Sequence, residues 1–206
     1  MFLRQTMILM FQKMTKNIYL DCDGVLLDSP AAKARFFNTK YNCKFNENQY
    51  PSQWDYSGTG FDLHSATNLF LESVEFEKIP PIEGAQKAVT QLADAGYKIQ
   101  VVTSISDIEA IKFKRIRNLE RFFGKVFDDV IMFPLGWNNK TSFYSSSPRG
   151  TVVDDSIFNI QDALNYNHDA VFITIAHNSD WHAFAKTKGM LTANSLYEAV
   201  RSNMIR

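Results

Sequence analysis

The sequence predicts a three-layer α/β fold in which helices cover both faces of a parallel sheet. Short apolar runs recur along the 206 residues, and amphipathic helical patterns separate several of them. The runs are mostly branched or aromatic, which is typical of strands that are buried on both faces. The predicted strands are 18–20, 99–102, 126–132, 151–153 and 171–173.

Two helical patterns follow this scheme most clearly. In "AQKAVTQLADAG" the residues Val89, Leu92 and Ala93 share one face, and Gly96 ends the helix. In "DIEAIKFKRIRNLERFFG" a second apolar face runs as far as Gly124 at roughly helical spacing. Its members are Ile108, Ile111, Ile116, Leu119 and Phe122. Helices placed between strands in this way are the connections that parallel strands require.

A long interval after the first predicted strand breaks this alternation. It contains helix-like pieces at 31–41 and 63–72 around the polar and aromatic segment "FNENQYPSQWDYSGTGF", with no convincing buried strand. About fifty residues are too many for an ordinary connection. We therefore expect residues 31–79 to form a small helical cap over the carboxyl edge of the sheet, and residues 14–30 and 80–206 to form the core domain.

Composition excludes several classes of partner. The chain has 22 basic and 22 acidic residues, so no overall field attracts it to a nucleic-acid polymer or an anionic membrane. Two cysteines, Cys22 and Cys43, are too few for a disulfide framework, which favours a reducing, cytoplasmic setting. The apolar patch at 7–11 is too short to span a membrane, and residues 1–13 are expected to be a frayed extension or an upstream start.

An acidic pair follows the first predicted strand. In "DCDG" the carboxylates Asp21 and Asp23 stand one residue apart, and Gly24 permits a sharp turn after them. Like charges this close repel each other unless a cation or a shared proton lies between them. A lone "DCDG" is more often only a turn, so the pair needs support from other parts of the chain.

Two further predicted strands also end in polar pairs. "VVTS" ends in Thr103 and Ser104, and "VVDD" ends in Asp154 and Asp155. Each pair alone suggests a helix N-cap. Because the carboxyl ends of parallel strands meet at one edge of the sheet, three polar strand ends together indicate a functional site there.

The order of these motifs resembles that of the haloacid dehalogenase superfamily of phosphohydrolases: "DCDGV", "VVTS", a lysine and "VVDD". The segments "LDCDGVLLDS", "IPPIEGAQKAV", "VVTS", "NNKT", "VVDD" and "AHN" are most similar to the 5'(3')-deoxyribonucleotidases, over residues 17 to about 178. The chain departs from the family pattern at Ser29, Ile105 and "YSSSPRG". The resemblance implies a Rossmann-like, haloacid dehalogenase-like core with a helical cap, and hydrolysis of deoxyribonucleoside monophosphates.

The resemblance also implies a role for each acidic residue. Asp21 would be the nucleophile that forms an aspartyl-phosphate, and Asp23 would protonate the leaving oxygen and later activate water. Mg²⁺ would be held by Asp21, the backbone carbonyl of Asp23, Asp155 and, through water, Asp154. A bound cation would explain why two carboxylates stand so close in "DCDG".

Hydroxyl groups and a lysine would bind the phosphate. Thr103, assisted by Ser104, would donate hydrogen bonds to its oxygens. The candidates for the lysine are Lys112, Lys114, Lys125 and Lys140. We choose Lys140, because "NNKTSF" follows the strand ending at Met132 and precedes "VVDD", whereas Lys112 and Lys114 lie within a helix and are expected to face solvent.

The partner is expected to be a small phosphomonoester, and a homodimer is left open. Trp54, Phe70 and Phe76 are candidates for stacking on a nucleobase, but packing the core of the cap is the more common role of such residues. Two alternatives to a deoxyribonucleotide phosphatase stay open. One is a phosphatase for a sugar phosphate or other small metabolite, and the other is a non-catalytic binding protein on the same fold.

Overall fold

The computed structural model describes residues 16–135 and 140–205, so the expectation for residues 1–13 lies outside the described part of the chain. Six parallel strands form one sheet in the order β3-β2-β1-β4-β5-β6. They are β1 (Lys16–Leu20), β2 (Tyr97–Ile105), β3 (Asp129–Pro134), β4 (Gly150–Asp154), β5 (Asp169–Ile173) and β6 (Leu191–Ala193). The predicted α/β fold with a parallel sheet is confirmed.

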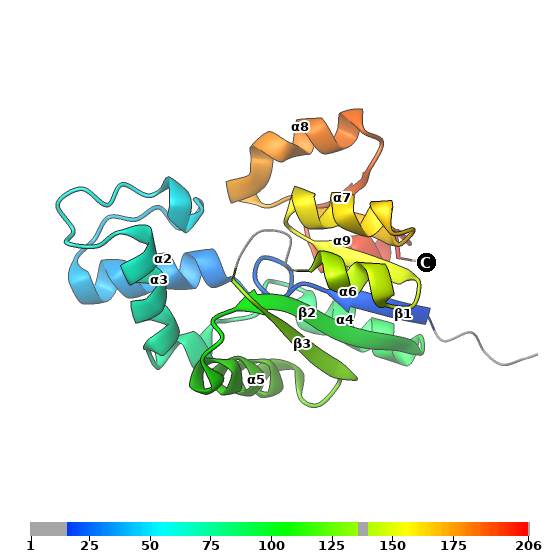
Figure 1. Cartoon of the computed structure of the whole chain (residues 1–206), viewed down its shortest axis with the longest axis horizontal. Helices are drawn as coiled ribbons and strands as arrows, with labels where there is room; N and C mark the ends of the chain where they lie inside the picture. The colour runs from blue at the N-terminus through cyan, green and yellow to red at the C-terminus, as the bar shows by residue number, and fades with distance from the viewer. Residues whose placement is uncertain (1–15, 136–139, 206) are drawn as a thin grey trace, which may run out of the picture.

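Helices cover both faces of the sheet (Figure 1). On one face lie α4 (Ala85–Asp94), α5 (Glu109–Phe123) and α9 (Leu196–Arg201). On the other face lie α6 (Thr141–Ser146), α7 (Ile157–Asn165) and α8 (Ser179–Thr187). Each face has its own apolar cluster, so the molecule has two cores separated by the sheet.

The strands serve both cores through the alternation of their side chains. In β1, Ile18 and Leu20 pack on the side of α4 and α5, whereas Tyr19 packs on the side of α6 and α7. In β4, Val153 and Val152 divide in the same way. Both faces of these strands need apolar residues, which is why the sequence shows continuous apolar runs instead of alternation.

Two strand predictions differ from the structure. The strand predicted at 126–132 is observed at Asp129–Pro134. Just before it, the Asp128 carboxylate accepts a 2.7 Å hydrogen bond from the Ile99 N–H. The edge strand β6 was not predicted. It has three residues, and Leu191 at its start is exposed, so it has no apolar run of the expected kind.

The buried side of α5 also differs from the prediction. Ile108 is exposed, because it occupies the N-cap position just before the helix. The buried residues of α5 are Ile111, Arg115, Asn118 and Leu119, which share one face. Asn118 donates to the backbone carbonyls of Glu77 and Ile79, and Arg115 has partners at the functional site. A helix that appears simply amphipathic therefore carries polar groups into the interior.

Residues between β1 and α4 stand beyond the carboxyl edge of the sheet (Figure 1). They form α2 (Ser29–Tyr41), the 3-10 turn η1 (Pro51–Gln53), α3 (Leu63–Glu72) and the 3-10 turn η2 (Glu75–Lys78). Aromatic side chains hold them together, with Phe37 contacting both Phe45 and Phe61, and Phe36 contacting Phe70. We call the segment from α2 to η2 the cap. The boundaries at residues 31 and 79, which the sequence suggests, stay a prediction.

The order in which successive strands join the sheet changes side at β1. From β1 the chain proceeds to β2 and β3 on one side, and it then crosses to β4, β5 and β6 on the other side. Ligands of open α/β sheets bind at the carboxyl ends of the strands where such a reversal occurs. The topology therefore places a binding site between the ends of β1 and β4.

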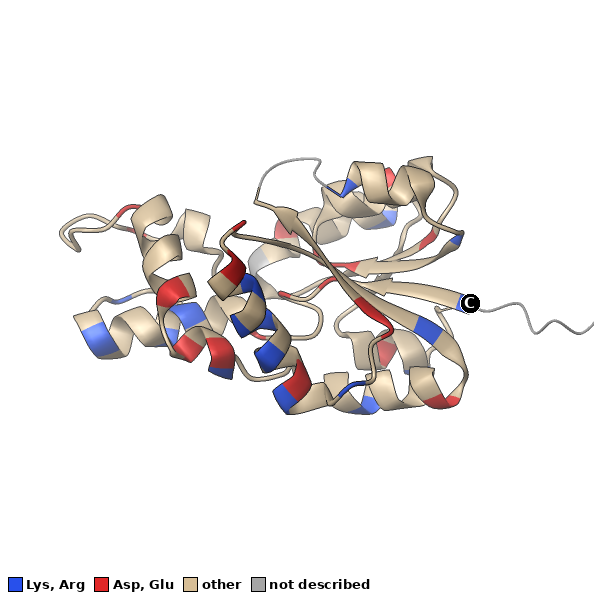
Figure 2. Ribbon diagram, turned by 60° about the horizontal axis from the view of Figure 1, so that its bottom comes forward, with Lys and Arg blue, Asp and Glu red and all other residues tan. Residues whose placement is uncertain are grey.

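The charges of the described residues are spread over the molecule. Figure 2 shows acidic and basic residues mixed along the helices, and the sequence of α5 contains both kinds. In the described part of the chain, no helix has the length and apolar character needed to cross a membrane.

Candidate active site

The acidic motif lies in a tight loop after β1. The Asp21 N–H donates to the carbonyl of Val153, which ties the start of the loop to β4. The Leu26 and Leu27 N–H groups both donate to the carbonyl of Cys22, so the chain turns back at once. Asp21 is buried, whereas the side chain of Asp23 is 36% exposed. The loop thus presents two carboxylates in different surroundings.

Gly24 allows this loop to pass close to the end of β4. Its φ of +84° is in the left-handed region, where residues other than glycine are strained. A Cβ atom at this position would lie 2.2 Å from Asp155 Oδ2, so any side chain here would displace the Asp155 carboxylate or the loop. The glycine therefore serves both the turn and the approach of the loop to the second acidic pair.

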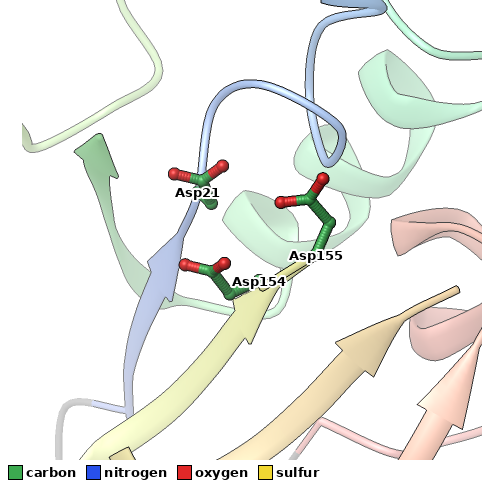
Figure 3. Close-up of side chains that lie close together, drawn as sticks. All are labelled: Asp21, Asp154 and Asp155. Atoms are coloured by element: carbon green, nitrogen blue, oxygen red, sulfur yellow. The ribbon is translucent and has the colours of Figure 1, made fainter. Parts of the chain in front are cut away.

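Three carboxylates converge at the reversal point of the sheet. Asp21 comes from the end of β1, and Asp154 and Asp155 come from the end of β4, and their side chains point toward one another (Figure 3). Each offers an oxygen, and these oxygens lie within 4.8 Å of one another. All three residues are buried. Buried carboxylates at this spacing fit a divalent cation that prefers oxygen ligands.

Lys140 lies against two of these carboxylates. Its ammonium donates to Asp21 Oδ1 at 2.5 Å and to Asp154 Oδ2 at 2.8 Å. Burial lowers the pKa of Lys140, but Asp154 and Asp21 outweigh burial and hold that pKa well above its usual value. Burial raises the pKa of Asp21 well above its usual value; Lys140 opposes this effect, and Asp154 and Asp155 add to it. Lys140 is thus a permanent cation within an acidic cluster.

Neighbouring side chains fix the acidic pair of β4. Asp154 accepts from the Ser156 N–H at 2.8 Å and from Asn159 at 3.0 Å. Asp155 accepts a 2.6 Å hydrogen bond from the hydroxyl of Tyr50, which comes from the cap. Asn178 donates to the backbone carbonyl of Asp155 at 2.9 Å. These partners hold both carboxylates in defined directions.

Thr103 and Ser104, at the end of β2, line the same cavity as the carboxylates and Lys140. The cavity has a volume of about 400 Å³ and lies between the sheet edge and the cap. Thr103 is buried and Ser104 is partly buried. The structure therefore brings together every core residue that sequence reasoning assigned to the site.

Arg115 is a site residue that sequence reasoning missed. It is 1% exposed, donates to Asp23 Oδ2 at 2.8 Å and to Cys22 Sγ at 3.3 Å, and lies over the ring of Phe76. Its position in line with Ile111 and Leu119 on α5 was the available signal. Because a buried guanidinium needs a partner, a basic residue on an apolar helix face indicates an acidic group nearby.

Two more missed residues, Tyr50 and Asn159, gave weaker signals. Asn159 lies in the first turn of α7, five positions after Asp154. Tyr50 is separated from its partner Asp155 by 105 positions in the chain, so only the folded structure relates them.

The other lysines lie elsewhere. Lys112 pairs with Asp107 and Glu109 on the surface. Lys114 was expected to face solvent, but its ammonium donates to the carbonyls of Glu72 and Ser73 at the end of α3. Lys125 is exposed. Of the four lysines considered, Lys140 alone lines the cavity with the carboxylates.

The cap aromatics divide into two groups. Phe70 and Phe76 line the cavity and contact each other edge to face. Trp54 does not line the cavity. Its ring stacks on Phe45 at 4.5 Å between centroids, and its indole N–H donates to the carbonyl of Asn46. The structure therefore places Trp54 in the interior of the cap, away from the position expected for a substrate contact.

No protein-family model and no curated protein sequence matches the chain. Solved structures do match it. A haloacid dehalogenase-like family hydrolase from Streptococcus pneumoniae has a TM-score of 0.62 and 10% identity, covering 92% of this chain and 98% of that chain. A structure from Clostridium acetobutylicum, described as that of a predicted phosphatase, has a TM-score of 0.61 and 16% identity, with the same coverage.

A third match is a D,D-heptose 1,7-bisphosphate phosphatase from B. bronchiseptica, solved with magnesium and phosphate. Its TM-score is 0.55 at 16% identity, and it covers 92% of this chain and 98% of that chain. The protein has the haloacid dehalogenase-like fold. Because the sequence identities are 16% or lower, the comparisons show only that these chains follow the same path. The chemistry therefore has to be argued from the site itself.

Gly24→Ala should destabilise the protein more than a glycine replacement of equal backbone strain. Gly58 is the matched control, since its φ is +70° and a Cβ there meets nothing within 4 Å. We expect Gly58→Ala to lower the free energy of unfolding by about 1 kcal/mol and Gly24→Ala by about 3 kcal/mol, because only Gly24 faces a carboxylate. Urea unfolding in the presence of EDTA measures both, and equal losses would contradict the proposed close approach.

Proposed function

We propose that the protein is a magnesium-dependent phosphomonoesterase that hydrolyses a sugar phosphate or another small phosphorylated metabolite through a phosphoryl group on Asp21. The observation that carries this proposal is the convergence of three carboxylates, a buried lysine and two hydroxyl residues in one cavity. A non-catalytic binding protein would not need a nucleophile and a proton donor beside a cation site.

The acidic cluster fits Mg²⁺, since its donors are hard carboxylate oxygens. Asp21 and Asp155 would hold the ion directly, together with the backbone carbonyl of Asp23, while Asp154 would act through water. Asp154 suits the outer position, because Ser156, Asn159 and Lys140 already occupy its oxygens. The bound ion would neutralise the charge of an approaching phosphate. The phosphatase from B. bronchiseptica, which has the same fold, was solved with magnesium and phosphate.

Asp21 is the nucleophile in this proposal. One of its oxygens forms a bond to phosphorus while the bond from phosphorus to the ester oxygen breaks. Lys140, Thr103 and Ser104 bind the non-bridging oxygens, whose charge they stabilise during the transfer. Water then attacks the aspartyl-phosphate, which releases inorganic phosphate and restores Asp21.

Asp23 is the proton donor to the leaving oxygen. Arg115 binds Asp23 Oδ2, whereas Asp23 Oδ1 has no hydrogen-bond partner among the described residues. Oδ1 is therefore the oxygen that can carry a proton to the leaving group and later take one from water. Arg115 keeps the carboxyl group oriented toward the cavity, which preorganises the transfer.

Two observations bear on the leaving group. The similar structures include a phosphatase for a sugar bisphosphate, which favours a sugar phosphate or related metabolite as the substrate. A deoxyribonucleoside monophosphate is the second candidate, because Phe70 and Phe76 line the cavity and offer aromatic surface to a base. It is weaker, since both rings are almost fully buried and Trp54 lies outside the cavity lining.

A panel of phosphomonoesters tests the proposed function. We expect phosphate release that requires Mg²⁺, that EDTA abolishes and that falls by about three orders of magnitude in Asp21→Asn. Sugar phosphates should have a higher kcat/KM than thymidine or deoxyuridine monophosphate. A nucleotide at the top of the panel would select the second candidate, and activity in well-folded Asp21→Asn, free of hydrolysis back to Asp, would refute the nucleophile.

Asp23→Asn should affect substrates according to their leaving groups. An alkyl phosphate needs a proton on its leaving oxygen, whereas p-nitrophenolate departs without one. We expect kcat to fall by about 10²-fold or more for the alkyl ester and by clearly less for p-nitrophenyl phosphate. Steady-state kinetics on both substrates measures this, and equal losses would remove the reason for assigning the proton donor to Asp23.

Lys140→Ala should lower kcat far more than replacement of the other lysines that lie between "VVTS" and "VVDD" in the sequence. Removing a buried cation that contacts Asp21 and faces the phosphate should raise the barrier by about 3 kcal/mol, or roughly 10²-fold in kcat. Lys112→Ala and Lys125→Ala are the controls, because neither side chain lines the cavity. A severe loss of kcat in either control would show that the phosphate-binding lysine had been assigned to the wrong residue.

A further inference from the structure

Lys33 is a buried cation in the wall of the cavity that the proposed chemistry does not use. It lies on α2 in the cap and is 5% exposed. Its ammonium donates to Thr67 Oγ1 on α3 at 2.7 Å. The Thr67 hydroxyl in turn donates to the carbonyl of Leu63 at 2.6 Å, so it is correctly oriented to accept from Lys33. Lys33 and Thr67 both line the cavity.

The surroundings of Lys33 are incomplete for an ammonium group. An ammonium has three N–H donors, and the described residues supply one hydrogen-bond acceptor, which is neutral. Within the described ranges no carboxylate pairs with Lys33. Buried charges in proteins are normally paired, because burial without a counter-ion is costly. Lys33 lines the cavity, so a group bound there can supply further acceptors.

The charges around this end of the cavity leave an excess of positive charge. Lys33 and Arg115 line it, and the carboxylate whose charge acts on Lys33 is Asp23, which already binds Arg115. Burial lowers the pKa of Lys33 to about 8, and the negative charge of Asp23 opposes this effect. Trp54 lies on the interior side, with its ring centroid 5.8 Å from the Lys33 ammonium. Asp23 thus pairs with Arg115 and not with Lys33, although its charge acts on both buried cations.

A purely structural link between α2 and α3 does not account for this arrangement. A neutral donor would make the same hydrogen bond to Thr67 without the cost of a desolvated charge. Lys33 also lies near Asp23, which serves the leaving oxygen in the proposed mechanism. The cation is therefore on the side of the cavity where the leaving group has to lie.

We propose that Lys33 and Thr67 form a subsite for a second anionic group, a carboxylate or a phosphate, on the leaving group of the substrate. This rests on the proposed function, because it narrows the substrate class of the same cavity. An anion supplies the acceptors that the Lys33 ammonium lacks, and a charge-assisted hydrogen bond in a buried place is stronger than a neutral one. The preferred substrates are then phosphomonoesters with two anionic ends.

Matched substrates with and without the second anion test the subsite. The carboxylate pair is 3-phosphoglycerate and glycerol 3-phosphate, and the phosphate pair is fructose 1,6-bisphosphate and fructose 6-phosphate. We expect the wild-type kcat/KM to be higher for the doubly anionic member of at least one pair, and the pair affected identifies the anion. In Lys33→Met that preference should fall by about tenfold or more.

Two further variants make the result specific. Lys40→Met removes an exposed lysine of the same helix and should keep the wild-type preference, whereas Lys33→Arg keeps a cation and should retain most of it. Thermal melting of each variant checks that it is folded. An unchanged preference in folded Lys33→Met, or no preference in the wild-type enzyme for either pair, would overturn the subsite.

Calorimetry separates this inference from the proposed function. The Asp21→Asn protein with Mg²⁺ is titrated with each of the four compounds, and the Asp21→Asn/Lys33→Met protein serves as its control. Tighter binding of a doubly anionic compound that depends on Lys33 supports the subsite even if the wild-type protein hydrolyses no phosphomonoester. Equal binding by both proteins would reject the subsite, while phosphate release in the panel would still support the phosphatase.

Discussion

The crowding of three buried carboxylates around the Lys140 ammonium is the constraint on which the rest of the site depends. Asp21, Asp154 and Asp155 would repel one another in a low-dielectric interior without positive charge between them. Lys140 supplies one such charge and bonds two of the three carboxylates. The remaining demand for positive charge suits a divalent cation. In the proposed function this cation would lie beside the nucleophile Asp21 and balance the charge of a phosphate ester.

Residues from several elements of the fold contact this charged cluster and hold it in place. Gly24 lets the loop after β1 approach Asp155, Asn178 holds the backbone of that residue, and the Tyr50 hydroxyl reaches it from the cap. The cap therefore contributes to the acidic centre as well as covering it. At the opposite wall, Arg115 fixes Asp23, and Lys33 adds a cation from α2. The cavity therefore has one end formed by the three carboxylates, where we propose the metal, and another end that carries Arg115 and Lys33, where we propose the leaving group.

Much of this site could be predicted from strand ends, because polar residues that directly follow a buried strand lie at one edge of a parallel sheet. Asp21, Thr103 and Asp155 were found in this way, and Lys140 was chosen from its order in the chain. Arg115 was missed because the periodic pattern of α5 was interpreted through its apolar members alone. Trp54 was a candidate for stacking on a nucleobase because of the resemblance to the deoxyribonucleotidases, yet its ring packs on Phe45 inside the cap.

The sequence by itself determined the strands β1 to β5, their parallel arrangement and the chemical character of their ends, since apolar runs and the polar residues after them are local features of the chain. Only the tertiary structure decided which side chains face one another across the cavity. The contact of Tyr50 with Asp155 and the hydrogen bond of Lys33 to Thr67 join positions far apart in the chain, and one sequence carries no local signal for such pairs. The directions of buried cations depend on the packing around them, so the side chains that the cap contributes to the cavity wall are defined only when the chain is folded.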